Sequence, residues 1–475
     1  MSIPLMPILP LIVVSAASVV IMLVVACYRN HRLTHVLTLT GLGLAFVTLP
    51  AILSQVPVQV TPLFLIDGYA LFYSGLILLS ALVVALLSYD YLEGRREDPA
   101  EYYILLLIAT LGSMVLVAAS HFASFFLGLE VLSISLYALI AYDRRPLMAE
   151  AAVKYLVLAA ASASFLLFGM ALVYAQLGTM SFSEIASKLA SAGATDLVCV
   201  VATVMIIVGI GFKLALVPFH MWTPDVYQGA PAPITAYIAT VSKGAVFALL
   251  LRYFSGMDLN AYGPLFAIFT IIAISSMFAG NLLALFQTNI KRLLAYSSIA
   301  HLGYLLVAFL SSGPLRVSAV TFYLVAYFVM TLGAFGVVTV LSGKQNDAEQ
   351  IEEYHGLFAR RPGLAGIFTV MLLSLAGMPL TAGFIGKFYL VAAGVGSMLW
   401  LLVIVLLVNS AIGLFYYLRV IAVMFVREPE PGVTLPARLL TGGLVLAALL
   451  VLLVWLGVYP SPLLEMIQAI KIGAG

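Results

Sequence analysis

The sequence is poor in charge. Only 9% of its 475 residues are charged, whereas 64% are hydrophobic. A soluble domain carries roughly 25% charged residues, so a soluble globular surface is excluded. Apolar runs of about 20 residues recur along the whole chain, and each is long enough to cross a bilayer as a helix. The runs do not alternate as membrane β-strands would, so an all-α polytopic membrane protein is expected.

Motifs for redox or nucleotide chemistry are also missing. The two cysteines, Cys27 and Cys199, form no CxxC pair and cannot hold a four-thiolate iron–sulfur cluster alone. There is no GxGxxG after a strand and no GxxxxGK[ST] loop. Any redox or nucleotide chemistry must therefore reside in other chains. The first apolar run, from Pro4 to about Cys27, is too long for a signal-peptide core and is expected to be a retained helix.

Hydropathy predicts about 14 transmembrane helices. The expected ranges are 4–27, 34–54, 68–89, 101–119, 122–142, 151–177, 194–217, 232–256, 262–286, 289–311, 317–342, 363–391, 398–426 and 439–457. The segment from Gln55 to Asp67 contains two prolines and is expected to be a small non-helical excursion. The longest polar loop is expected between Ser342 and Pro362.

The distribution of basic residues supports this count. If the N-terminus lies outside, the inner loops hold 13 basic residues and the outer loops hold 4. The inner set is Arg29, Arg32, Arg95, Arg96, Arg144, Arg145, Lys291, Arg292, Lys344, Arg360, Arg361, Arg427 and Arg438. The outer set is Lys188, Arg252, Arg316 and Lys471. By the positive-inside rule, both termini are predicted outside, at the periplasmic face of a bacterial membrane.

An internal repeat is indicated at a shift of about 167 residues. Ser164–Gly169 then falls on Thr331–Gly336, and His220 falls on Lys387. Each unit would have five helices, and an odd number inverts the orientation of the second unit, as in many transporters. The predicted division is 1–100 for the first three helices, 101–256 and 257–426 for the two inverted repeats, and 427–475 for the last helix and tail.

Several ionisable residues fall inside apolar runs. A charge there costs several kcal/mol, so each is a functional candidate. These candidates are Glu130, Lys154, Lys213, His220, Lys243, His301 and Lys387. A buried lysine can release its proton near neutral pH because desolvation disfavours its charged form, and a nearby carboxylate reverses this preference. Histidine passes protons in both directions near neutral pH. The set therefore predicts a proton relay.

Structural roles are the alternative for some of these residues. Glu130 and Lys213 could form an ion pair that only locks two helices together. Lys154 lies close enough to a helix end to snorkel toward water. His301 could simply hydrogen-bond a neighbouring helix. Lys243 and Lys387 lie deeper in their helices, so a purely structural role explains them less well.

Two segments predict broken helices. Val217–Pro233 contains four prolines and one glycine, and Ala376–Gly386 contains one proline and three glycines. Proline removes a backbone donor and glycine loosens the turn. The freed carbonyls can be hydrated, which would let water reach Lys213 and Lys387.

Three stretches carry a family resemblance. GFKLALVPFHMWTPDVYQGAPAPITAYIATVSKGAVF, NLLALFQTNIKRLLAYSSIAHLGYLL and MLLSLAGMPLTAGFIGKFYLV resemble the antiporter-like membrane subunits of bacterial respiratory NADH:quinone oxidoreductase (complex I). The similarity extends from about Pro62 to Tyr417 and is closest to the N-type subunits. Lys387 favours this type, because M-type subunits usually have glutamate there. The short segment after the last helix argues against the longer L-type.

The resemblance implies fourteen helices with breaks in the seventh and twelfth, and a proton route through Glu130, Lys213, Lys243 and Lys387. It also implies a hetero-oligomer in the bacterial inner membrane. FMN, iron–sulfur clusters and quinone would be bound by partner subunits, with no cofactor or metal in this chain. Neither the residues nor the resemblance points to a nucleic acid. Two alternatives remain: a subunit of a multisubunit Na⁺/H⁺ antiporter, which shares the core motifs, and a non-conducting scaffold.

Overall fold

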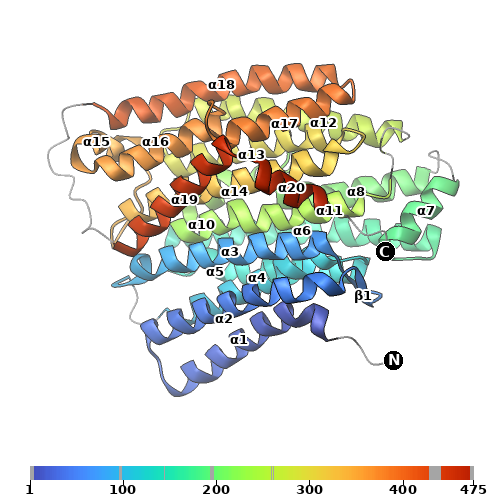
Figure 1. Ribbon diagram of the computed structural model, residues 1–475, viewed down its shortest axis with the longest axis horizontal. Helices are drawn as coiled ribbons and strands as arrows, with labels where there is room; N and C mark the ends of the chain where they lie inside the picture. Colours follow the sequence, from blue (N-terminus) through green and yellow to red (C-terminus); the bar gives the residue numbers. More distant parts are fainter. Residues whose placement is uncertain are drawn as a thin grey trace.

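The computed structural model describes residues 5–95, 99–143, 145–192, 197–257, 259, 262–426 and 440–470, and these are almost entirely helical (Figure 1). The helices of the first half are α1 (Leu9–Cys27), α2 (His31–Ile52), α3 (Gly68–Leu92), α4 (Ala100–Ala118), α5 (Phe122–Ile140), α6 (Pro146–Leu177), α7 (Phe182–Ala192), α8 (Leu197–Leu214), α9 (Trp222–Gly229), α10 (Ala232–Tyr237) and α11 (Lys243–Tyr253). Those of the second half are α12 (Gly263–Leu285), α13 (Ile290–Phe309), α14 (Leu315–Leu341), α15 (Leu357–Arg360), α16 (Pro362–Ala376), α17 (Ala382–Gly396), α18 (Trp400–Met424), α19 (Leu440–Val458) and α20 (Ser461–Ala469). The two strands are β1 (Val58–Thr61) and β2 (Phe64–Ile66).

The helices confirm a polytopic membrane protein. Within the described residues, 13 helices are long and apolar enough to cross a membrane. One of them, Ala232–Tyr253, is a continuous passage made of α10, a π-helical turn and α11. The range predicted as 363–391 is instead two shorter apolar helices, α16 and α17. Counted as one broken passage, this pair brings the total to the predicted fourteen. The inverted-repeat relation and the four-part division of the chain stay predictions.

Local sequence explains where the structure differs from the predicted ranges. Helix α6 begins at Pro146 rather than 151, because proline fits the first turn of a helix, where its missing N–H is not needed. The short helices α7 and α20 were not predicted, since both mix polar and apolar residues and are too short for a hydropathy scan. The expected non-helical excursion is confirmed as an antiparallel hairpin, with Val58 of β1 opposite Ile66 of β2.

The two ends of the bundle differ in character. The hairpin and α7 lie at one end, and α15 lies at the other (Figure 1). We call the α15 end the basic end. The basic residues predicted for the inner loops that the structure describes are Arg29, Arg32, Arg95, Arg145, Lys291, Arg292, Lys344, Arg360 and Arg361. Arg96, Arg144, Arg427, Arg438 and Lys471, which also entered the count of basic residues, lie outside the described residues. Arg252 was wrongly assigned to an outer loop: it lies in the last turn of α11, where its side chain is 4% exposed.

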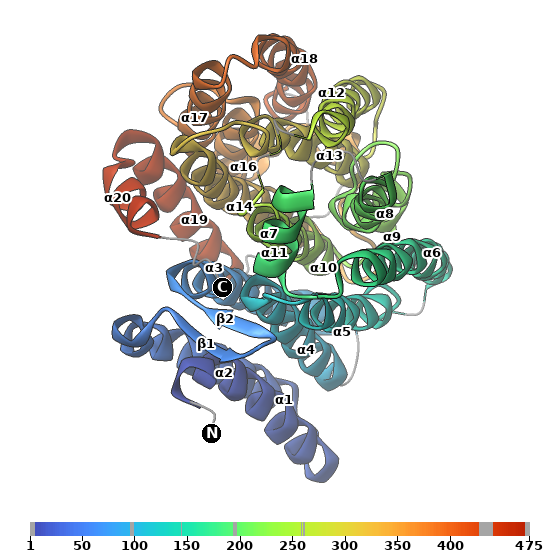
Figure 2. The ribbon, with the colours of Figure 1, turned by 90° about the vertical axis from the view of Figure 1, so that its right-hand side faces the viewer.

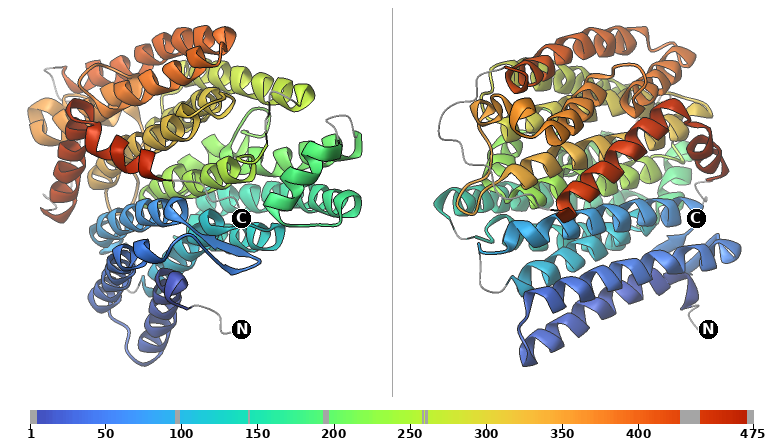
Figure 3. Two further views of the ribbon diagram at one scale, coloured as in Figure 1. Left: turned by 45° about the vertical axis from the view of Figure 1, so that its right-hand side comes forward. Right: turned by 60° about the vertical axis from the view of Figure 1, so that its left-hand side comes forward.

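The middle of the bundle is formed by α10, α11, α13 and α14. Figure 2 looks along the helices and shows α10, α11 and α14 inside a ring of the others. All residues of Ala232–Tyr253 are buried, as are those of α14 from Ser318 to Leu341, whereas α1 is largely exposed. Figure 3 shows α19 and α20 on one flank and α1 with α2 at the edge of the bundle. The most buried helices are thus those that carry Lys243 and His301 or pack directly against them.

Candidate functional site: a buried chain of lysines and histidine

Both predicted helix breaks are present. Helix α8 ends at Leu214, and the next residue, Ala215, has a φ of 58°. Helix α16 ends at Ala376 and is followed by Gly377 with a φ of 89°. This left-handed conformation cannot continue a right-handed helix, so the chain must stop and restart in both places. Lys213 lies in the last turn before the first break, and Lys387 lies shortly after the second.

A third irregularity precedes Lys243. Residues Ile238–Ser242 form a π-helical turn, and α11 begins at Lys243 itself. Such turns leave the regular backbone hydrogen-bond pattern and are frequent at functional sites. Lys213, Lys243 and Lys387 therefore each lie near a departure from α-helical geometry.

Lys213 is bound by hydroxyl groups rather than by a carboxylate. Its Nζ donates to Ser133 Oγ at 2.6 Å and to Tyr155 OH at 3.3 Å. The predicted partner, Glu130, lies one helical turn before Ser133 on α5 and is near enough to act on Lys213 electrostatically. The structure describes both residues and shows no ion pair between them. Glu130 lies in the middle of α5, as predicted, and its side chain is partly buried.

Lys243 lies at the centre of the molecule. Its Nζ donates to Ser298 Oγ at 2.7 Å and lies 5.1 Å from the ring centroid of Tyr227. Tyr327 OH also donates to Ser298 Oγ, at 2.7 Å. One serine of α13 thus joins a lysine of α11 to a tyrosine of α14. No carboxylate forms an ion pair with Lys243 anywhere in the described part of the chain.

His301 continues this line on α13. Its two ring nitrogens lie 2.7 Å from Tyr323 OH and 3.2 Å from Tyr417 OH. The imidazole centroid is 5.6 Å from that of Tyr327 and 5.4 Å from that of Tyr304. His301 therefore lies between the tyrosine that reaches Ser298 and the tyrosine that faces the last lysine.

Lys387 completes the set. Its Nζ donates to Ser410 Oγ and to the Ala376 carbonyl, each at 2.7 Å, and lies 5.2 Å from the ring centroid of Tyr304. Ala376 is the last residue of α16, so its carbonyl has no partner in the next helical turn. The break in this passage thus supplies the acceptor that holds the lysine.

These contacts form one sequence of polar and aromatic groups across the protein. Between Lys213 and Lys243 lie Tyr155 and Trp222, whose ring centroids are 4.8 Å apart, and the Trp222 ring is 6.0 Å from Lys243 Nζ. We call the whole set the buried chain; it consists of Lys213, Tyr155, Trp222, Lys243, Ser298, Tyr327, His301, Tyr304 and Lys387. The relay predicted from sequence therefore has its three deepest lysines and one histidine in a single connected line.

Two predicted candidates stand apart from the buried chain. Lys154 is 45% exposed and forms ion pairs with Glu150 at 2.7 Å and Asp225 at 2.9 Å. His220 lies in the turn between α8 and α9, and it donates or accepts no side-chain hydrogen bond with either neighbouring lysine among the residues described.

The hydroxyl partners of the lysines were missed by the sequence analysis. Serine and tyrosine are frequent in these helices, so their presence alone gives no signal. For Ser298 a signal existed, because residues at spacings of three, four and seven share one face of a helix. Ser298 lies three residues before His301 on α13, and that spacing could have identified it.

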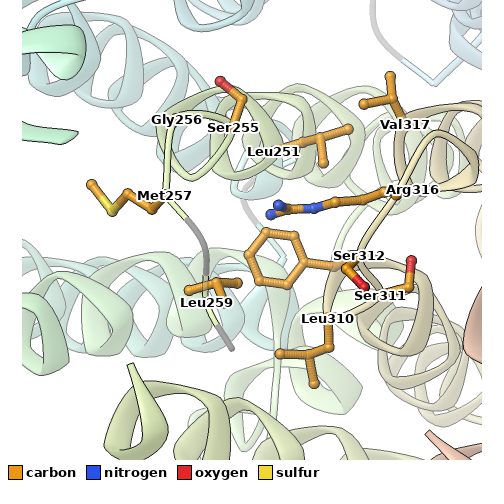
Figure 4. Close-up of a pocket in the computed structure, with 12 residues that line it drawn as sticks. Leu251, Ser255, Gly256, Met257, Leu259, Leu310, Ser311, Ser312, Arg316 and Val317 are labelled. Carbon is orange, nitrogen blue, oxygen red and sulfur yellow. The ribbon is translucent and has the colours of Figure 1, made fainter. Parts of the chain in front are cut away.

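A cavity of about 540 Å³ lies far from the buried chain, where α11 and α13 end and α14 begins. Arg316 points into it between Leu251 and Leu310 (Figure 4). The Arg316 guanidinium lies 5.0 Å from the ring centroid of Phe309. The cavity touches none of the buried lysines and takes no part in the chemistry considered below.

Lysine, histidine, serine and tyrosine, which make up most of the buried chain, are side chains that donate or accept protons in hydrogen bonds. Within the described ranges, no group of three or more histidine, cysteine or acidic side chains is arranged so that it could hold a metal ion. A polytopic helical bundle with two broken passages and buried lysines defines the antiporter-like class of membrane subunits.

Comparisons with known proteins agree. Residues 119–413 match the family described as NADH:quinone oxidoreductase/Mrp antiporter, TM. The chain is 48% identical to NADH-quinone oxidoreductase subunit N of Ectopseudomonas mendocina (strain ymp), over 98% of this chain and 96% of that protein. The chain belongs to the family of NADH-quinone oxidoreductase N subunits.

Solved structures share the fold. A chain of respiratory complex I from Thermus thermophilus is 33% identical, with a TM-score of 0.83 over 98% of this chain and 100% of that one. A chain of the Mrp complex from Dietzia sp. DQ12-45-1b is 21% identical, with a TM-score of 0.85 over 98% and 96% of the two chains. At that identity the second likeness concerns the fold alone.

Proposed function

We propose that this chain is a proton-translocating subunit in the membrane arm of a bacterial NADH:quinone oxidoreductase. The observation that supports this most is the buried chain, which joins Lys213, Lys243, His301 and Lys387 between two broken helices. NADH oxidation and quinone reduction, with FMN and iron–sulfur clusters, take place in partner subunits. The basic end faces the cytoplasm, which places both termini in the periplasm.

Proton transfer uses the hydroxyl groups that hold each lysine. A hydroxyl both donates and accepts, so it can pass a proton from one neighbour to the next. Lys213 exchanges protons through Ser133 and Tyr155, and Lys243 does so through Ser298. Glu130 sets the direction, because its negative charge favours a charged Lys213 and moving it away favours release.

The second half of the route runs through His301. Its ring packs against Tyr327 and Tyr304, while its two nitrogens lie at hydrogen-bond distance from Tyr323 OH and Tyr417 OH, and either nitrogen can accept or release a proton. Lys387 then exchanges with Ser410 at the second break, where freed carbonyls can be hydrated. We assign no step to Lys154 or His220, because the described residues show no hydrogen bond from either side chain to the buried chain.

The test is proton pumping by the whole complex in liposomes. Lys213→Ala and Lys243→Ala each remove one ammonium from the buried chain, and Lys154→Ala is the matched control on the exposed lysine. Complexes with either of the first two variants should assemble, yet lose proton uptake and most of their NADH:quinone turnover. Removing a proton-transfer group typically costs about 100-fold or more. The control should pump normally.

A non-conducting scaffold predicts a different result. In that case both buried-lysine variants would assemble and pump at the rate of the unaltered complex. The subunit composition of each variant complex is confirmed by gel. Normal pumping by both variants would then refute the proposed proton-translocating function.

The family description also includes Mrp antiporters, which motivates one further measurement. If the chain served a Na⁺/H⁺ antiporter, proton movement in the liposomes would need a sodium gradient and no NADH. Replacing all sodium by potassium separates the two functions. A redox-driven proton pump should retain its NADH-dependent proton uptake in potassium.

A further inference from the structure

A cluster of buried charges lies at the basic end, outside the buried chain. Asp347 forms ion pairs with Lys291 at 2.9 Å and with Arg95 at 3.1 Å, and it accepts a hydrogen bond from Tyr91 OH at 2.7 Å. The side chains of Lys291, Arg95 and Asp347 are 1%, 2% and 7% exposed. Asp143 lies 3.7 Å from Arg95. We call these five residues the basic-end cluster. Burying these charges costs desolvation free energy, which charges in an exposed loop would not lose.

Lys291 was expected only to add positive charge to one membrane face. It instead shares a helix face with the buried chain. Ser298 lies seven residues after Lys291 on α13, and His301 lies three residues further. Seven residues are two helical turns, a rise of about 10 Å. The basic-end cluster is therefore aligned with the serine that binds Lys243.

Polar groups occupy the interval between Lys291 and Ser298. Lys291 Nζ donates to the Ala230 carbonyl at 2.6 Å, and Thr235 Oγ1 lies 3.4 Å from the same oxygen. At the other side, Tyr227 OH lies 3.4 Å from Ser298 Oγ. Ala230 joins α9 to α10, so this interval lies against an irregular part of the backbone.

The cluster also reaches toward the surface. Arg145 is 34% exposed and lies 3.8 Å from Asp143, while Arg95 connects Asp143 to Asp347. Burial raises the pKa of Asp347, but the positive charges of Lys291 and Arg95 outweigh this and hold its pKa below the usual value. Asp347 therefore stays anionic near neutral pH and keeps a positive charge on Lys291 favourable.

We infer that Lys291, held by Asp347, is the group through which Lys243 exchanges protons with the basic end. This inference rests on the proposed function. The Lys291 ammonium gives one proton to a hydroxyl or water in the interval beside Tyr227 and Ser298. The acceptor passes one proton on to the neutral amine of Lys243, which becomes an ammonium. The neutral Lys291 amine then regains a proton from water that reaches the cluster beside Arg145, and Asp347 keeps its charge throughout.

A purely structural ion pair is the competing explanation, and arginine separates the two. Lys291→Arg retains the positive charge and donors for Asp347 and Ala230, but a guanidinium does not release its proton in proteins. Arg292→Lys is the matched control at the adjacent position, where the native side chain is 27% exposed and binds Asp225. Both variants are measured in the reconstituted complex.

The Lys291→Arg complex should lose NADH-driven proton pumping by about 100-fold, the low side of the effect of removing a proton-transfer group. The Arg292→Lys complex should stay within about twofold of the unaltered complex, as expected where no proton-transfer group is lost. If Lys291→Arg pumps normally, Lys291 is only an anchor and the inference is overturned.

Asp347→Asn gives a second measurement, which does not require an arginine side chain to fit at position 291. It removes the carboxylate that favours the Lys291 ammonium. The alkaline limb of the pH–turnover profile should therefore move to lower pH, whereas loss of a structural anchor would lower turnover at all pH values without moving the limb. An unmoved limb overturns the inference.

The same preparations distinguish this failure from failure of the proposed function. If the unaltered complex pumps, Lys243→Ala does not, and both cluster variants behave normally, only the inference about Lys291 fails. If Lys243→Ala also pumps normally, the proposed function fails as well.

Discussion

The ion pair between Asp67 and Arg252 allows a quantitative test of how the N-terminal helices are held to the central passage. Arg252 of α11 donates to the two carboxylate oxygens of Asp67 at 2.7 and 3.0 Å. The two side chains are 4% and 2% exposed. Asp67 also caps α3 by accepting from the Ala70 N–H at 2.8 Å. The Asp67 carboxylate therefore caps the N-terminus of α3 and also binds the guanidinium of Arg252 in another passage.

Breaking this pair should be costly. Arg252→Met leaves a buried carboxylate without its cation, which costs about 3–5 kcal/mol of unfolding free energy. Asp67→Ser keeps a hydroxyl acceptor at the start of α3, so the loss of about 1 kcal/mol expected from removing a cap is avoided. Asp67→Ser still leaves the buried Arg252 guanidinium without its carboxylate. It should therefore also lower the free energy of unfolding by about 3–5 kcal/mol.

The double variant carries the test. Removing both charges of a buried pair is often nearly neutral, so Arg252→Met with Asp67→Ser should be more stable than either single variant. Unfolding of the detergent-purified chain, followed by far-UV circular dichroism, measures all four proteins. A double variant more stable than either single variant requires a coupling energy above about 3 kcal/mol, which is the upper end of the range for residues in contact. Purely additive destabilisation by the two substitutions would show that the pair does not act as described.

Three other perturbations have expected outcomes. The pKa of Asp347 is lower in the folded protein than its usual value of 3.8, so its ionised side chain contributes fully to stability above that value. This contribution is lost as the pH falls through the lower native pKa. The unfolding curves of Asp347→Asn and the unaltered protein should therefore differ near neutral pH and converge in acid. Gly383→Ala places a methyl group against a backbone carbonyl of α16 and should destabilise by about 1–3 kcal/mol in thermal unfolding, whereas Gly363→Ala, with open space around it, should not. Ser298→Ala removes the hydroxyl shared by Lys243 and Tyr327 and should lower proton pumping by about 100-fold without loss of assembly, and normal pumping would exclude Ser298 from the route.

Features set by local chemistry were predictable from sequence. The apolar runs located the passages, and the glycine and proline residues located both breaks. Proline also marked the hairpin between Gln55 and Asp67. Lys213, Lys243 and Lys387 stood out because a charge in an apolar run is costly wherever the fold places it.

Features set by contacts between distant segments were not predictable. Ser133 and Lys213 are 80 positions apart, and Asp67 and Arg252 are 185 apart. Nothing local distinguishes Ser133 from the other serines of these helices. The burial of Lys291 was not foreseen for the same reason, because its partner Asp347 lies 56 positions further along the chain.

The contact between Lys387 and the Ala376 carbonyl has an electrostatic consequence. Ala376 ends α16, and a helix C-terminus carries a partial negative charge that attracts cations. A carboxylate partner would be stranded as a bare anion in a low-dielectric interior each time Lys387 lost its proton. A peptide dipole has no net charge to strand, so the site stays close to neutral once its cation has gone. The interrupted helix thereby provides a counter-ion substitute that suits a repeatedly loaded and emptied lysine.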